Sequence, residues 1–153
     1  MHDAPQPALV SARACVRDPD GITVYVRAHR VSVGPPMSFD VREPQVTAVE
    51  HFLAAVAADL LGSLQRQARR QRIVVDRLEA SLHGVVADPL AWLGVVGESG
   101  TPRLESVSIR VFVDSPADPP CLDSLWSAAA GNSILLNTLK AAVPIELSLR
   151  HQP

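Results

Sequence analysis

The chain has 153 residues, of which 47% are hydrophobic and 20% charged, so it can bury one core of ordinary domain size. Its formal net charge of -2 shows no basic excess, which argues against a nucleic acid as partner. No stretch of the chain has the roughly 20 predominantly apolar, uncharged residues that a membrane span needs. We therefore predict a single domain over residues 1–153, with residues 1–8 flexible, that binds neither nucleic acid nor membrane.

Cysteine and histidine usage gives no sign of a metal site. Cys15 and Cys121 lie far apart and belong to no C-x-x-C pair. The five histidines show no ligand spacing. No basic segment followed by an apolar one opens the chain, so we expect a cytoplasmic protein. We also expect no cofactor.

The first part of the chain alternates between apolar and polar residues over residues 9–16 and again over residues 22–33. The linking Asp18-Pro19-Asp20-Gly21 is typical of a turn, because proline presets φ and glycine allows positive φ. We predict a β-hairpin.

A long helix is predicted from Thr47 to about Arg72. Its apolar stripe recurs at steps of three and four residues and consists of Val49, Phe52, Leu53, Val56, Leu60 and Leu64. Thr47 and Glu50 have the spacing of a capping box, in which each side chain satisfies a backbone donor of the other residue. Four arginines between residues 66 and 72 suit the negative end of the helix dipole, and we interpret them as a solvated helix end.

The second half combines strands and helices. Residues 76–83 and 107–113 alternate as strands, and the glycine-rich span 85–102 between them reads as a loop or ragged hairpin. Asp118 followed by proline predicts a helix that Gly131 ends, and Asn132 or Ser133 can cap a second, short helix. Residues 145–149 alternate again. This order of elements predicts an α+β domain.

Two local motifs resemble the OsmC/Ohr family of small α+β thiol peroxidases and their relatives. In that family the central helix opens with a P-x-E-x-L-L-x-A-type run that ends in the peroxidatic cysteine, and Asp59 takes the position of this cysteine. The later motif begins with the resolving cysteine, and Ser133 takes its position. The matching residues are Glu50, Phe52, Leu53, Ala54, Ala55 and Ala58 in the first motif and residues 132–139 in the second.

The resemblance implies an OsmC-like fold, with antiparallel sheets packed around a long central helix, and an intertwined homodimer. In the peroxidase branches a glutamate ten residues before the peroxidatic cysteine pairs with an arginine. Val49 holds that position here, and Glu50 follows it. Arg42 is the candidate for the arginine.

Peroxide reduction by this route needs a thiolate that becomes a sulfenic acid and a second thiol that releases it as a disulfide. A carboxylate and a hydroxyl do neither. Cys121, in the first turn of a predicted helix, is the other thiol to consider, although an unpaired cysteine is more often a small buried hydrophobe.

Asp59 has two interpretations. It is a general base or ligand-orienting carboxylate beside the apolar Phe52 and Val56, or it is a remnant paired with an arginine or with solvent. We therefore predict an OsmC-like protein that has lost peroxidase activity and binds a small apolar ligand or a partner. The alternatives are an inherited organic hydroperoxide reductase and a non-thiol enzyme that uses Asp59 as its base.

Overall fold

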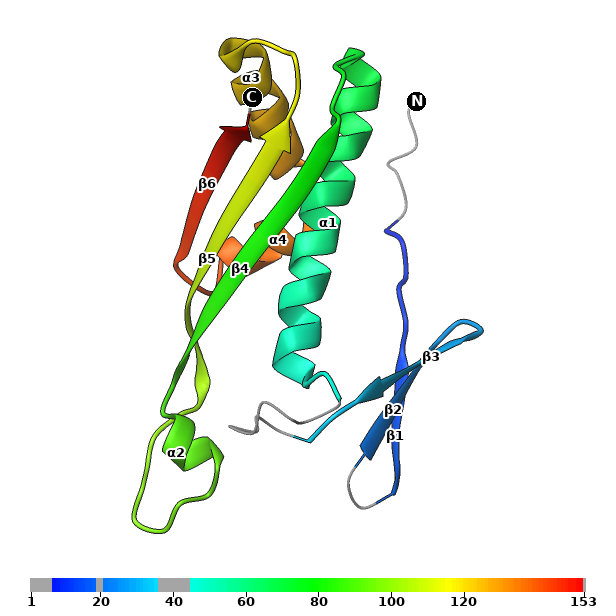
Figure 1. The fold of residues 1–153 in the computed structure, drawn as a ribbon. Helices are drawn as coiled ribbons and strands as arrows, with labels where there is room; N and C mark the ends of the chain where they lie inside the picture. Colours follow the sequence, from blue (N-terminus) through cyan, green and yellow to red (C-terminus); the bar gives the residue numbers. More distant parts are fainter. Residues whose placement is uncertain (1–6, 19–20, 36–44, 153) are drawn as a thin grey trace. The chain divides into compact units, whose positions relative to one another are not determined.

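The computed structural model of the chain describes residues 7–18, 21–35 and 45–152 (Figure 1). The chain forms two compact units, one ending at His51 and one beginning at Phe52. The predicted flexible start at residues 1–8 falls mostly outside the described residues. Arg42 and the turn at Pro19 and Asp20 also lie outside them.

The first unit contains an antiparallel sheet of three strands in the order β1-β2-β3, which are Arg13–Asp18, Gly21–Val26 and His29–Val33. We predicted one strand over residues 22–33, but a tight turn divides it, because Val26 pairs with His29. Arg27 in this turn has φ of 54°. The prediction missed the turn because neither Arg27 nor Ala28 is a residue type that signals one.

Helix α1, Ala48–Gln71, agrees with the prediction at both ends. The Thr47 amide donates to the Glu50 carboxylate at 2.8 Å, and the Glu50 amide donates to Thr47 Oγ1 at 3.3 Å, which makes the predicted capping box. The helix ends where Arg72 adopts a left-handed φ of 57°. There the Ile73 amide donates to the Ala68 carbonyl and the Arg72 amide donates to the Arg69 carbonyl, the bonds of a Schellman motif.

The second unit is a three-stranded sheet with helices (Figure 1). Strands β4, Arg77–Ala87, and β5, Arg103–Asp114, pair antiparallel and are joined through the short helix α2, Pro89–Trp92. Helices α3, Pro119–Gly131, and α4, Ile134–Lys140, follow, and β6, Ile145–Gln152, adds to the free side of β5. The α+β class is therefore confirmed.

The direction of β6 corrects the expectation of purely antiparallel sheets. Strand β6 runs parallel to β5, with Val107 opposite Ile145 and Val111 opposite Leu149. Two helices connect these strands, and a crossover of this kind is what allows neighbouring strands to run in the same direction. The span 85–102, predicted as a loop or a ragged hairpin, contains the end of β4 and helix α2 and joins the antiparallel strands β4 and β5.

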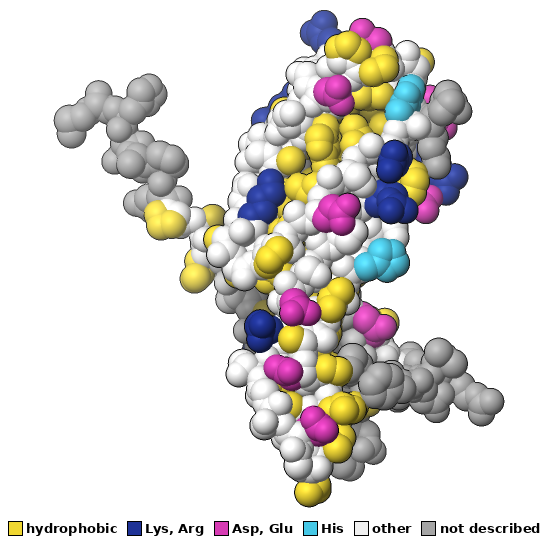
Figure 2. Space-filling model, turned by 90° about the vertical axis from the view of Figure 1, so that its left-hand side faces the viewer, with side chains coloured by type: hydrophobic (Ala, Val, Ile, Leu, Met, Phe, Trp, Pro, Cys, Tyr) yellow, Lys and Arg dark blue, Asp and Glu magenta, His cyan; other side chains and the backbone are white. Residues whose placement is uncertain are grey.

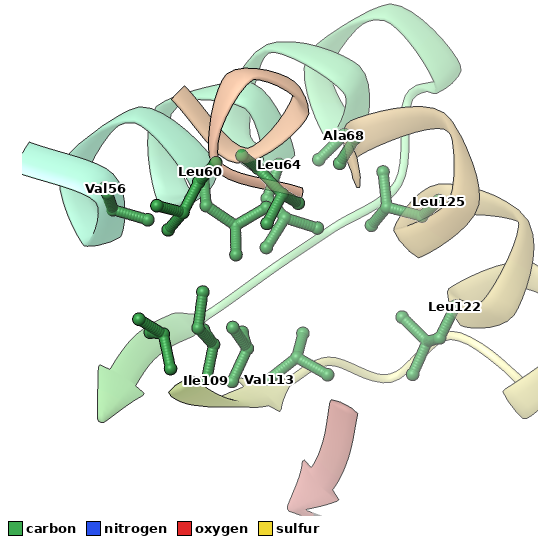
Figure 3. Packing of buried hydrophobic residues seen from close by; sticks show 13 residues of the cluster. Val56, Leu60, Leu64, Ala68, Ile109, Val113, Leu122 and Leu125 are labelled. Atoms are coloured by element: carbon green, nitrogen blue, oxygen red, sulfur yellow. The ribbon is translucent and has the colours of Figure 1, made fainter. Parts of the chain in front are cut away.

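The core of the second unit lies where α1, β5, α3 and α4 meet. Figure 3 shows Val56, Leu60, Leu64 and Ala68 of α1 together with Ile109 and Val113 of β5 and Leu122 and Leu125 of α3. Alternate residues of β5 between Val107 and Val113 are at most 1% exposed, as the period of a half-buried strand requires. Within the described ranges, no helix has the length and apolar content needed to cross a membrane.

Candidate functional site

Asp59 and Ser133 are hydrogen-bonded to each other, although 74 residues separate them in the chain. Ser133 Oγ donates to Asp59 Oδ2 at 2.6 Å. Asp59 lies in the middle of α1, one residue before the buried Leu60, and Ser133 comes directly before α4. The sequence motifs that predicted these two positions therefore meet at one point of the fold.

The same two side chains cap helix α4. Asp59 Oδ2 also accepts from the Leu135 amide at 3.0 Å, and Ser133 Oγ accepts from the Leu136 amide at 3.3 Å. Ser133 has the extended backbone of an N-cap residue, with φ of -83° and ψ of 116°. Two of the four free amides at the start of this seven-residue helix are thus satisfied, one by each side chain.

The polar side chains near this pair form hydrogen bonds to other groups of the protein. Ser133 is fully buried and Asp59 is half-buried. Ser63, one turn further along α1, donates from Oγ to the Ala129 carbonyl at 2.8 Å. Asn137 Nδ2 donates to the Gly131 carbonyl at 2.9 Å, which fixes the turn between α3 and α4. Among the described residues every buried side-chain nitrogen and oxygen has a partner.

Both interpretations of Asp59, as a general base or as a remnant paired with an arginine or with solvent, stay predictions. No arginine of the described chain forms a salt bridge with Asp59, where the only ion pair joins Arg77 and Glu79. Asp59 Oδ2 accepts from two donors, the Ser133 hydroxyl and the Leu135 amide. In this arrangement the Ser133 hydroxyl donates to Asp59, and both side chains cap helix α4.

The other predicted residues have separate surroundings. Glu50 belongs to the capping box at the start of α1, and the hydrogen bond from the Thr47 backbone lowers the pKa of its carboxyl. Val56 is fully buried in the core, whereas Phe52 is 38% exposed. Arg42 lies outside the described residues, so the predicted pair of Glu50 and Arg42 stays a prediction.

Neither cysteine takes part in this site. Cys15 in β1 and Cys121 in the first turn of α3 are both half-buried free thiols. In the part of the chain that the structure describes, no group of three His, Cys, Asp or Glu side chains could hold a metal ion.

The sequence did not predict the main-chain group of this site, which is the Leu135 amide that donates to Asp59. The Leu135 amide carries no side-chain signal, and its partner comes from a helix far away in the chain. The one available signal was Ser133 itself, which the sequence already identified as a possible N-cap residue. A serine N-cap accepts from the helix by its own oxygen and leaves its proton for a second acceptor, which here is Asp59.

The model of the OsmC-like protein family matches residues 42–148, about 70% of the chain, and this range includes both Asp59 and Ser133. The chain belongs to this family. A comparison of the sequence with curated proteins finds no match.

Solved structures of the OsmC and Ohr type share this fold. An OsmC-like protein from Mycoplasma pneumoniae is 12% identical, with a TM-score of 0.81 over 97% of this chain and 100% of that one. An organic hydroperoxide resistance protein from Elizabethkingia anophelis is also 12% identical, with a TM-score of 0.73 over 97% and 100%. The organic hydroperoxide resistance protein OhrB of Bacillus subtilis is 17% identical, with a TM-score of 0.64 over 94% and 100%.

Proposed function

We propose that this OsmC-family protein does not carry out thiol peroxidase chemistry and instead acts as a homodimeric module that binds a small ligand or a partner. One observation supports this most: Ser133 and Asp59 are hydrogen-bonded at 2.6 Å, at the positions where the family resemblance implies two cysteines. An oxygen pair of this kind forms no sulfenic acid and no disulfide.

The proximity of the two side chains strengthens the equivalence. A resolving thiol must approach a peroxidatic sulfur closely enough to bond with it, and disulfides require Cβ atoms within about 4.5 Å. The 2.6 Å contact brings the ends of the Ser133 and Asp59 side chains together, and disulfide formation in the double variant tests whether their Cβ atoms are also close enough. With oxygen in place of sulfur at both positions, the two side chains stay in contact but cannot carry out the redox reaction.

The exposed surface of α1 supports a homodimer. Ala54, Ala55 and Ala58 are all exposed on this helix, and the larger Phe52 is 38% exposed. Small side chains let a second helix approach closely, and an uncovered apolar helix face favours association. A separate band of hydrophobic side chains lies over the upper part of the face shown in Figure 2, which is the β6 side of the second unit and not the α1 side.

The decisive experiment measures consumption of an organic hydroperoxide, such as cumene hydroperoxide, with a dithiol as reductant. We expect the native protein to give no rate above the reductant alone. We expect the double variant Asp59→Cys/Ser133→Cys to consume hydroperoxide and to form an intramolecular disulfide on oxidation. Each single variant lacks one of the two thiols and serves as the matched control.

Turnover by the native protein that Cys121→Ser abolishes would overturn the proposal, because the family reaction would then run on a different thiol. A double variant that folds but forms no disulfide would contradict the equivalence of the two positions with the family cysteines.

A further inference from the structure

A hollow of about 410 Å³ opens in the second unit between the last turns of α1 and the segment that leads into β4. This volume lies within the range of small-molecule sites. The hollow begins at Gln65, nearly two turns beyond Asp59 along α1, and neither Asp59 nor Ser133 lines it. It is therefore distinct from the capped joint between α1 and α4.

The lining combines an apolar surface with charged groups. Ala68, Ile73, Val75 and Leu78 supply aliphatic side chains, and Arg69, Asp76 and Arg77 supply the charges. Arg77 is already engaged, because its Nη2 lies 2.6 Å from Glu79 Oε2. Arg69 is exposed and forms no salt bridge within the described chain, so its guanidinium is the cation available to a ligand.

The walls of the hollow are fixed by hydrogen bonds. The Ile73 amide donates to the Ala68 carbonyl at the end of α1, and the Asp76 amide donates to the Asp114 carbonyl, both at 2.9 Å. Ser115 Oγ donates to the Val74 carbonyl at 2.6 Å. A site whose walls are already ordered requires little conformational entropy to be lost when a ligand binds.

The charge of this region selects an anion. Residues 65–79 contain five arginines and two acidic residues, Asp76 and Glu79, in a chain whose formal net charge is -2. The excess of arginines in this segment, of which Arg69 and Arg77 line the hollow, favours negatively charged ligands. A guanidinium presents two parallel donors to a carboxylate, which adds geometric selectivity to the charge.

We propose that this hollow binds a small amphipathic carboxylate, with its carboxylate on Arg69 and its aliphatic tail against Ile73, Val75 and Leu78. The assignment rests on the proposed function in one respect, since it takes the chain to be a binding module and names the ligand class. It makes no use of Asp59, Ser133 or either cysteine.

The test titrates decanoate into the isotopically labelled full-length chain and follows the backbone amides by NMR. We expect saturable shifts confined to residues 65–78 and to the adjoining residues 113–115. Arg69→Gln should weaken decanoate binding at least tenfold, and Arg110→Gln, at an exposed arginine outside the hollow, should leave it unchanged. Decanol, which has the same tail without the charge, should bind at least tenfold more weakly than decanoate, and acetate should give no saturable shifts.

Three results would overturn the assignment: decanoate binding that Arg69→Gln does not weaken, shifts centred on other residues, or acetate binding as tight as that of decanoate. The native chain in the same preparation is assayed with hydroperoxide. Peroxide turnover contradicts the proposed function whatever the chain binds, whereas an inert chain that gives no saturable decanoate shifts contradicts only the assignment of the hollow.

Discussion

Asp59 Oδ2 serves two donors at once, the Ser133 hydroxyl and the Leu135 amide. A hydrogen bond to a carboxylate is stronger than one between neutral groups, and burial of Ser133 keeps water from competing for it. One side chain of α1 therefore holds the start of α4 in place. The contribution of this contact to the stability of the fold is measurable.

We expect Ser133→Ala to destabilise the protein by about 1–2 kcal/mol, because the Leu136 amide loses its acceptor and Asp59 loses a donor. Asp59→Ala should cost about 2 kcal/mol or more, since it leaves both the Leu135 amide and the buried Ser133 hydroxyl without their acceptor. Urea unfolding measures both changes.

The control is Ser127→Ala, at an exposed serine whose hydroxyl donates to the Asp123 carbonyl within α3. This variant should stay within about 0.5 kcal/mol of the native protein. Equal unfolding midpoints for Ser127→Ala and Ser133→Ala would show that the buried hydroxyl stabilises nothing.

Glu50 gives a pH dependence whose sign follows from its capping box. The hydrogen bond from the Thr47 backbone lowers the pKa of this carboxyl below 4.5, so the folded state favours the ionised form. Its contribution to stability is present in full above the unfolded pKa and is lost as the pH falls through the folded pKa. Glu50→Gln, which keeps an acceptor for Thr47 but does not ionise, should therefore lose less stability than the native protein between neutral pH and about pH 3.

The measurement is a series of urea titrations across that range, with Glu98→Gln as the control at an exposed glutamate in a loop. Identical acid profiles for the native protein and Glu50→Gln would contradict the assigned role of the carboxylate.

For single residues, the sequence predicted a contact where the two residue types and their spacing form a known local motif. Thr47 directly precedes α1 and Glu50 lies in its first turn, so their spacing of three residues alone predicted their contact. Asp59 and Ser133 were associated only through the family resemblance, because no local pattern connects residues 74 positions apart. The binding role suggested for Phe52 and Val56 stays a prediction, and full burial of Val56 identifies it as a core residue.

At the scale of helices and strands, some features of the structure could be predicted from the sequence pattern and others could not. Helix α1 and the strands β4 and β5 were predicted because their apolar residues repeat with a clear period. The period of a strand does not specify the direction of its neighbour, so the parallel pairing of β5 and β6 was missed. The turn at Arg27 was missed because it lacks the residue types that usually indicate positive φ.

The backbone at the C-terminal end of α1 is strained at Arg72, and a substitution there can relieve the strain. Arg72 occupies the left-handed position of the Schellman motif, which is usually glycine. Arg72→Gly should stabilise the protein by about 1 kcal/mol, because glycine adopts positive φ without a Cβ penalty. Thermal unfolding monitored by circular dichroism measures the change.

Arg70→Gly is the matched control, at an exposed position inside the same helix. Glycine there should destabilise by about 1 kcal/mol, because it lowers helix propensity and relieves no strain. Effects of the same sign in both variants would contradict the assignment of strain to Arg72.

At the scale of the whole molecule, the exposed alanines of α1 predict how substitutions change the formation of a homodimer. If α1 lies in a dimer interface, Ala58→Lys should convert the protein to a monomer, because a lysine at a closely packed helix contact brings both bulk and charge. Sedimentation velocity should show two chains for the native protein and one for Ala58→Lys. Ser127→Lys, at an exposed position of α3, should remain a dimer.

A native chain that sediments as a monomer would remove the homodimer from the proposal and leave the fold unchanged. A dimer that persists in Ala58→Lys would place the interface elsewhere on the surface.

The all-oxygen joint between α1 and α4 has a consequence for where and when this protein can operate. Hydrogen peroxide and glutathione act on sulfur, and neither has a reaction with a carboxylate or an aliphatic alcohol under cellular conditions. The contact between Asp59 and Ser133 therefore has no sulfur to oxidise or reduce, and we expect it to persist through an oxidant burst.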